Sequence, residues 1–229
     1  MKKETALEFL FYSYFNIDFE TAKNEHDLLI VAIERAYRDA ASHVLQVDSG
    51  KADKDKINDD RQEHKNKAIN KLFECITQDR ISDDWHKNAV DALIETYAGS
   101  DLIFTFGIAQ KWVNMTVKYL FIMNSVLKET GNVVLDNICE KFDGMIDVPV
   151  DDYIIRAACD GGICVPCRDK NKEYSGMKDK YSSKIPWSQW EDTYYTEFQE
   201  TIKKEAGDEH ILDYENRLWI KTAMKQNGK

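Results

Sequence analysis

The sequence is poor in the residues that interrupt helices, with only 3 prolines and 10 glycines among 229 residues. Proline and glycine are the residues that a helix interior tolerates least. Apolar residues recur at helical spacing along most of the chain. We therefore predict an all-α fold, organised as one unit over residues 1–229 that is either a single domain or two closely fused lobes.

Long hydrophobic runs are also missing. No apolar run reaches the roughly 18 residues that a membrane-spanning helix needs, and residues 1–15 have neither the apolar core nor the small-residue cleavage site of a secretion signal. The 5 cysteines are an odd number, which favours a reducing compartment over a disulfide framework. We expect a cytoplasmic protein without a membrane partner.

Positive charge is in deficit, because the formal net charge is −10. This deficit argues against a surface that attracts nucleic acid everywhere, since such surfaces carry an excess of lysine and arginine. A protein that binds DNA at one site needs only a local positive footprint. The charge therefore excludes a broadly basic protein and leaves a localised DNA site open.

Hydrophobic periodicity predicts the positions of the helices. They are expected over residues 5–15, 26–47, 68–78, 81–99, 106–123, 131–142, 150–159, 186–207 and 209–226. Residues 48–67 alternate charges without an apolar face, which predicts a solvated loop. Ser82 is the expected N-cap of its helix, and Val150 or Asp151 that of the helix after Pro149.

The stretch "FGIAQK", Phe106 to Lys111, has an unusual order of residues. Lys111 is expected in the first turn of a helix, where the helix dipole disfavours a cation, so some other requirement must override the dipole. A hairpin glycine that lets the backbone approach closely, followed at once by a helix N-terminus, can grip a DNA phosphate through backbone amides. Gly107 would supply that close approach.

A second motif, "VPVDDYIIRAA" from Val148 to Ala158, places a carboxylate at the start of a helix. Together the two motifs resemble the helix-hairpin-helix DNA glycosylase superfamily. Its pattern is a Gly-x-Gly-x-Lys hairpin, then a Val-Pro-Val-Asp segment, with an arginine five residues after the aspartate. The matching positions are Gly107, Lys111, Pro149, Val150, Asp151 and Arg156.

The chain also departs from that pattern. Ala109 stands where the family has its second hairpin glycine, and Tyr153 stands where a histidine is common. The separation between the lysine and the aspartate is 151 − 111 = 40 residues, longer than in the commonest members and more similar to archaeal 8-oxoguanine glycosylases. These differences indicate a divergent branch of the superfamily.

The resemblance implies two helical lobes with a cleft between them, a hairpin near residues 104–127 and a catalytic aspartate segment at residues 148–158. It also implies a DNA N-glycosylase that flips a modified base out of double-stranded DNA and cleaves its N-glycosidic bond, in base-excision repair or in antiviral defence. Such an enzyme would act as a monomer without a cofactor. The implied residues are Asp151 and Lys111 for catalysis, and Gly107, Ala109, Gln110 and Lys118 for DNA binding.

The chemistry of base excision explains why these residue types would be needed together. Breaking an N-glycosidic bond builds oxocarbenium character on the deoxyribose, which a nearby carboxylate stabilises. Asp151 would supply that carboxylate. Lys111, as a neutral amine, could attack the same sugar carbon and form a Schiff base, which would add strand-nicking lyase activity.

Two other groups of residues suggest alternatives. Cys159, Cys164 and Cys167 have metal-like spacing, but the fourth ligand would have to be Cys139 or His210, so we expect no metal or iron-sulfur site. Arg38 and His43 fit the Arg-x4-His pattern of HEPN ribonucleases, which cut RNA as dimers. A HEPN-like ribonuclease or toxin is therefore the alternative function, and a non-catalytic DNA-binding module is the third.

Aromatic residues cluster near the C-terminus of the chain. They are Trp187, Trp190, Tyr194, Tyr195 and Phe198. Such side chains can stack on a flipped base. At helical spacing they are more often part of a hydrophobic core, which is the interpretation that we favour.

Overall fold

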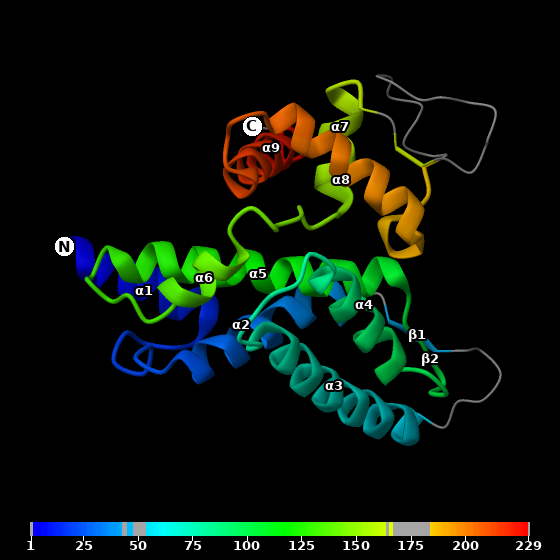
Figure 1. Ribbon diagram of the computed structural model, residues 1–229, viewed down its shortest axis with the longest axis horizontal. Helices are drawn as coiled ribbons and strands as arrows, with labels where there is room; N and C mark the ends of the chain where they lie inside the picture. Colours follow the sequence, from blue (N-terminus) through cyan, green and yellow to red (C-terminus); the bar gives the residue numbers. More distant parts are fainter. Residues whose placement is uncertain (1, 43–44, 48–53, 164, 167–183, 229) are drawn as a thin grey trace. The chain divides into compact units, whose positions relative to one another are not determined.

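The computed structural model describes residues 2–42, 45–47, 54–163, 165–166 and 184–228, and their regular secondary structure is almost entirely helical (Figure 1). The helices are α1 (Lys3–Phe15), α2 (Glu25–Ala40), α3 (Lys54–Ile76), α4 (Trp85–Thr96), α5 (Phe106–Lys128), α6 (Asp136–Phe142), α7 (Asp152–Asp160), the 3-10 helix η2 (Trp187–Gln189), α8 (Asp192–Ala206) and α9 (Ile211–Gln226). The predicted all-α class is confirmed. Among the residues described, no helix is both long and apolar enough to cross a membrane.

The chain divides into two compact units. The first contains residues 1–104 and 112–145, and the second contains residues 105–111 and 146–229. Helix α5 therefore gives residues 106–111 to the second unit and its remaining residues to the first. Because both motifs singled out in the sequence fall in the second unit, that unit holds the candidate site.

The first unit is built around helices α2 to α5. Helix α3 packs against both α2 and α4 (Figure 1). Trp112 of α5 is fully buried and donates its indole N–H to the carbonyl of Ile33 on α2 at 2.9 Å, so its polar atom is satisfied inside the core. The largest fully buried aliphatic side chains of this unit are Leu28, Leu29, Ile33, Leu72, Ile76, Leu93, Leu120 and Met123.

The second unit packs α9 against both α7 and α8. Its core joins Ile154, Ile155 and Ala158 of α7 to Phe198 and Ile202 of α8. The aromatic residues at the C-terminus take part in this core, because Trp190, Tyr195 and Phe198 are buried while Trp187 and Tyr194 pack at its edge. The interpretation of the aromatic cluster as core is confirmed.

The expected solvated loop at residues 48–67 is wrong for most of its length. Helix α3 begins at Lys54 and runs to Ile76. A polar helix can be stabilised by pairs of side chains one turn apart. In α3 such pairs join Glu63 to Lys67 at 2.5 Å and Gln62 to Asn66 at 2.9 Å. These pairs and the packing of α3 on α2 and α4 stabilise the helix, although residues 48–67 lack the apolar face by which the prediction recognised helices.

Several expected helix boundaries are also wrong, such as the start of the helix expected over residues 131–142, which begins as α6 at Asp136. The helix expected over residues 26–47 ends as α2 at Ala40, and Gln46–Val47 forms strand β1 instead. β1 pairs antiparallel with β2 (Leu102–Ile103), which is distant in the sequence. The conformation of β1 therefore depends on a partner strand that the local hydrophobic pattern does not reveal. Helix α4 begins at Trp85 with Asp84 as its N-cap, so the prediction of Ser82 as N-cap is wrong. The carbonyl of Ser82 accepts from the Trp85 amide in the turn before the helix.

Candidate functional site

The segment before Asp151 is anchored to one face of α8. The Val148 amide donates to Oε1 of Gln199 at 3.0 Å, and the Val148 carbonyl accepts from Nε2 of the same side chain at 2.8 Å. The Gln199 amide thus pairs with the Val148 backbone as a neighbouring β-strand would. Asp147 accepts from the Tyr195 hydroxyl at 2.7 Å and pairs with Lys203 at 2.6 Å. Residues 195, 199 and 203 are one turn apart along α8, so a single helix face fixes the approach to Asp151.

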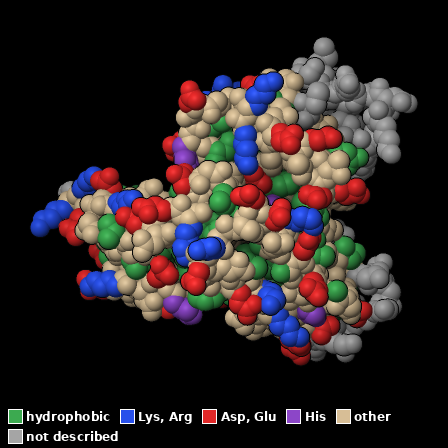
Figure 2. Space-filling model, in the orientation of Figure 1, with side chains coloured by type: hydrophobic (Ala, Val, Ile, Leu, Met, Phe, Trp, Pro, Cys, Tyr) green, Lys and Arg blue, Asp and Glu red, His purple; other side chains and the backbone are tan. Residues whose placement is uncertain are grey.

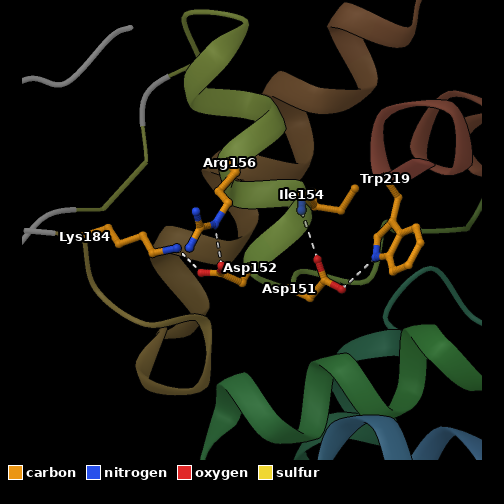
Figure 3. Close-up of polar contacts among 6 residues, drawn as sticks. All are labelled: Asp151, Asp152, Ile154, Arg156, Lys184 and Trp219. Carbon is orange, nitrogen blue, oxygen red and sulfur yellow. Dashed lines mark hydrogen bonds and ion pairs between the residues drawn. The ribbon is translucent and has the colours of Figure 1, made fainter. Parts of the chain in front are cut away.

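The sequence left Val150 and Asp151 as candidates for the N-cap of α7, and the structure shows that it is Asp151. Its Oδ1 accepts from the Ile154 amide at 2.9 Å, and its Oδ2 accepts from the indole N–H of Trp219 at 3.2 Å (Figure 3). The side chain is half-buried, and the helix behind it places partial positive charge next to the carboxylate. Two neutral donors therefore hold a carboxylate that still reaches the surface.

Asp152, the next residue, lies among cations instead. Arg156 binds it at 2.6 Å and Lys184 forms a second ion pair with it, on the side away from Trp219 (Figure 3). Burial by itself would raise the pKa of Asp152, but the hydrogen bonds from Lys184 and Arg156 outweigh burial and lower the pKa below its ordinary value. The charge of Asp152 is already compensated by two partners.

The "FGIAQK" segment lies within a helix. Helix α5 begins at Phe106, where the periodicity predicts a helix, so these residues of the expected hairpin region 104–127 are helical. Lys111 is the sixth residue of α5 and therefore lies beyond its first turn. Thr105 caps the helix, since its hydroxyl accepts from the Ile108 amide at 3.3 Å. The same hydroxyl donates to the carbonyl of Ser188, which ties the start of α5 to η2.

Gly107 permits this close contact with η2. A Cβ at position 107 would lie 2.1 Å from the carbonyl oxygen of Trp187 and 2.8 Å from the carbonyl carbon of Ser188. Both are backbone atoms that cannot rotate away, so only glycine fits here. The sequence suggested a close approach of Gly107 to DNA, whereas the backbone that packs against it in the structure is that of Trp187 and Ser188. Contact of Gly107 with DNA stays a prediction.

Lys111 lies one helical turn after Gly107 and faces the same segment. Its Nζ is 4.4 Å from the centre of the Trp187 ring, and the residue is only 8% exposed. An ammonium over an indole face is attracted by the negative face of the ring. Trp187 thus supplies a favourable contact for a cation near the positive end of α5.

We expect replacement of Gly107 by alanine to lower the free energy of unfolding by about 1–3 kcal/mol, because the new methyl group must push η2 away from α5. Chemical denaturation of the full chain measures the change. Gly161→Ala is the matched control in the same unit, since its added Cβ makes an ordinary contact of 3.4 Å with the Ala157 carbonyl. Equal stability of the two variants would contradict the packing role of Gly107.

The other residues predicted to bind DNA are buried. Ala109 and Gln110 are 0% exposed and Lys118 is 8% exposed. The Gln110 side chain donates to the Gly107 carbonyl at 2.9 Å within α5. Lys111 and Asp151 belong to the second unit, whereas Lys118 belongs to the first. A role of these residues in DNA binding stays a prediction.

The alternative sites fall partly outside the described residues. Cys164 and Cys167 lie there, as does His43. Cys159 packs in the hydrophobic core of the second unit, and among the described residues no group of histidine, cysteine and acidic side chains has the arrangement of a metal site. Arg38 is exposed on α2.

Three residues around Asp151 and Lys111 were missed as site residues. Trp219 is 68 residues from Asp151, and nothing near it in the sequence marks the contact. Trp187 was assigned to the hydrophobic core in preference to stacking on a flipped base. Gln199 carried a usable signal, because it is a polar residue that shares the buried face of α8 with Tyr195 and Ile202. A buried polar side chain needs a hydrogen-bonding partner, which here is Val148.

The chain matches no protein-family model, and neither the search of curated proteins nor the search of solved structures gave a match.

Proposed function

We propose that the chain is a DNA glycosylase that hydrolyses the N-glycosidic bond of a modified base. The observation that carries this proposal is the arrangement of Asp151. Its carboxylate is half-buried at the N-terminus of α7, both of its oxygens are held by neutral donors, and no described cation is paired with it. The resemblance of the surrounding "VPVD" segment to the glycosylase superfamily supports the same conclusion.

This geometry suits the chemistry of base excision. A carboxylate has about four lone-pair sites, of which the Ile154 amide and the Trp219 indole occupy one on each oxygen. The remaining lone pairs can orient a water molecule. The negative charge, fixed in place before the reaction, stabilises the positive charge that develops on the sugar as the base departs.

Asp152 does not compete for this role. Its charge is compensated by Arg156 and Lys184, so it would stabilise positive charge on the sugar less than Asp151 would. The arginine that the superfamily pattern places five residues after the aspartate therefore binds Asp152 in this chain. Of the two adjacent carboxylates, we assign Asp151 to the reaction and Asp152 to holding the start of α7.

We assign Lys111 to substrate binding. Its ammonium, held over Trp187, can donate to a phosphate or to the extruded nucleotide. Positive groups must act locally in this protein, because the net charge is −10 and Figure 2 shows lysine and arginine interspersed with acidic side chains on the face in view. DNA binding that depends on such contacts weakens as salt is added.

A panel of duplex oligonucleotides tests the proposal. Each duplex carries one modified base, either an oxidised purine such as 8-oxoguanine or a foreign modification such as 5-hydroxymethylcytosine, and an unmodified duplex serves as the control. We expect abasic sites, scored by alkaline cleavage, with at least one modified duplex and none with the control. An oxidised purine would indicate repair, and a foreign modification would indicate antiviral defence. Absence of abasic sites on the whole panel, and on genomic DNA of modified phages, would contradict the proposal.

A further inference from the structure

Trp219 of α9 contacts the carboxylate assigned to catalysis. Its indole N–H donates to Oδ2 of Asp151 at 3.2 Å, from a position 68 residues further along the chain (Figure 3). We propose that Trp219 is the positioning residue for Asp151, which sets the plane of its carboxylate for the reaction. This inference rests on the proposed glycosylase function.

The need for a second donor follows from the geometry of an N-cap. The Ile154 amide fixes Oδ1 at 2.9 Å, but a single hydrogen bond leaves the carboxylate free to turn about the bond that carries it. A second donor on Oδ2, coming from a different helix, restricts that rotation. Catalysis by a fixed charge depends on such restriction, because a group that must reorient during the reaction loses part of its stabilising effect.

The nature of the donor matters as well. A cation at this place would compensate the charge of Asp151, as Arg156 and Lys184 compensate that of Asp152. An indole N–H is neutral and donates only one hydrogen bond. Trp219 can therefore orient the carboxylate while leaving its negative charge for the sugar.

The indole is itself held by α7. The ring of Tyr153 lies 4.8 Å from the ring of Trp219, tilted by 49°. Tyr153 is the residue that replaces the histidine common in the superfamily pattern, and it comes two residues after Asp151. Helix α9 packs along α7, with Leu212 and Thr222 of α9 buried. The same short helix thus carries the carboxylate and a side chain that orients its partner.

Replacing Trp219 with phenylalanine tests the inference, because it keeps a ring beside Tyr153 and removes the N–H group. We expect kcat for base excision to fall about tenfold, the cost of one hydrogen bond to a charged group, while KM stays unchanged. In an Asp151→Asn background the same replacement should cause no further loss, since residues that act through one another are not additive.

Trp190→Phe is the matched control. It removes an equivalent indole hydrogen bond, from Trp190 to the Ile185 carbonyl at 3.0 Å, in the same unit. We expect this variant to lower stability and to leave kcat unchanged at a temperature where it is folded. An equal fall in kcat in both variants, or a full additional loss in the Asp151→Asn background, would overturn the positioning role.

A measurement that needs no activity tests the contact itself. The chain has 5 tryptophans, so its indole N–H signals can be resolved by NMR, and the signal that disappears in Trp219→Phe belongs to Trp219. We expect Asp151→Ala to shift this signal and to speed its exchange with water, and Asp152→Ala to leave it unchanged. If the indole N–H signal of Trp219 is unchanged in Asp151→Ala, the inference is overturned. If that signal responds as expected but the protein makes no abasic sites, only the proposed function is contradicted.

Discussion

Asp151→Asn is expected to lower the rate of base excision at least about a hundredfold, the loss typical for removing one preorganised charge-stabilising group. The substitution removes the negative charge that would face the sugar. It should leave DNA affinity nearly unchanged, because the shape of the side chain is preserved. Single-turnover excision on the responsive duplex, with binding measured on the same duplex, checks both parts.

The fold of the Asp151→Asn variant should survive, since asparagine is as good an N-cap as aspartate. Its amide oxygen can still accept from the Ile154 amide. Its amide nitrogen is a donor and cannot accept from Trp219, so the variant also loses that orienting contact. Circular dichroism and a denaturation curve should therefore show a folded protein with a small loss of stability.

Asp152→Asn is the matched control for charge removal at the same helix end. We expect it to weaken the ion pairs with Arg156 and Lys184 and to lower stability, while excision stays within a few-fold of the wild type. Excision at the wild-type rate by Asp151→Asn, or a larger loss from Asp152→Asn, would remove Asp151 from the mechanism.

The second large effect is expected at Lys111. We expect Lys111→Gln to lower kcat/KM for excision about tenfold to a hundredfold, in line with the loss of a hydrogen bond from a charged group. The loss should be mainly in KM, because the ammonium over Trp187 is assigned to holding the substrate. Steady-state kinetics of the two proteins on the same duplex measure the change.

Two further variants test that assignment. Trp187→Leu removes the aromatic face beneath the ammonium and should reproduce part of the increase in KM. Lys204→Gln removes an exposed lysine on α8 in the same unit and should have little effect. An equal loss from Lys204→Gln would mean that Lys111 contributes only general positive charge.

Borohydride distinguishes the two roles that the sequence left open for Lys111. An ammonium held over an indole has no lone pair with which to attack the sugar, so we expect abasic sites without a trapped covalent adduct in the wild type. Water oriented by Asp151 would then complete the reaction. A trapped adduct that disappears in Lys111→Gln would show instead that Lys111 is a Schiff-base nucleophile and that the enzyme is also a lyase.

The sequence by itself determined the helical class and the local geometry at Asp151. Both are properties of short stretches, since helix periodicity repeats every few residues and an N-cap bonds to an amide three residues away. The pairing of Asp151 with Ile154 was therefore within reach of the sequence. Polar helices are harder to predict, and the N-terminal half of α3 was missed because its support comes from polar contacts, such as those of Glu63 with Lys67 and of His64 with the Thr96 carbonyl.

Only the tertiary structure decided which partners the two motifs meet. Trp219 reaches Asp151 from another helix, and the backbone of Trp187 and Ser188 fills the space that Gly107 leaves open. The residues in these contacts are separated by dozens of positions, so no local pattern marks them. Lys111 lies near the positive end of α5 because the ring of Trp187 attracts its charge. That ring belongs to η2, which only the folding of the second unit brings next to α5.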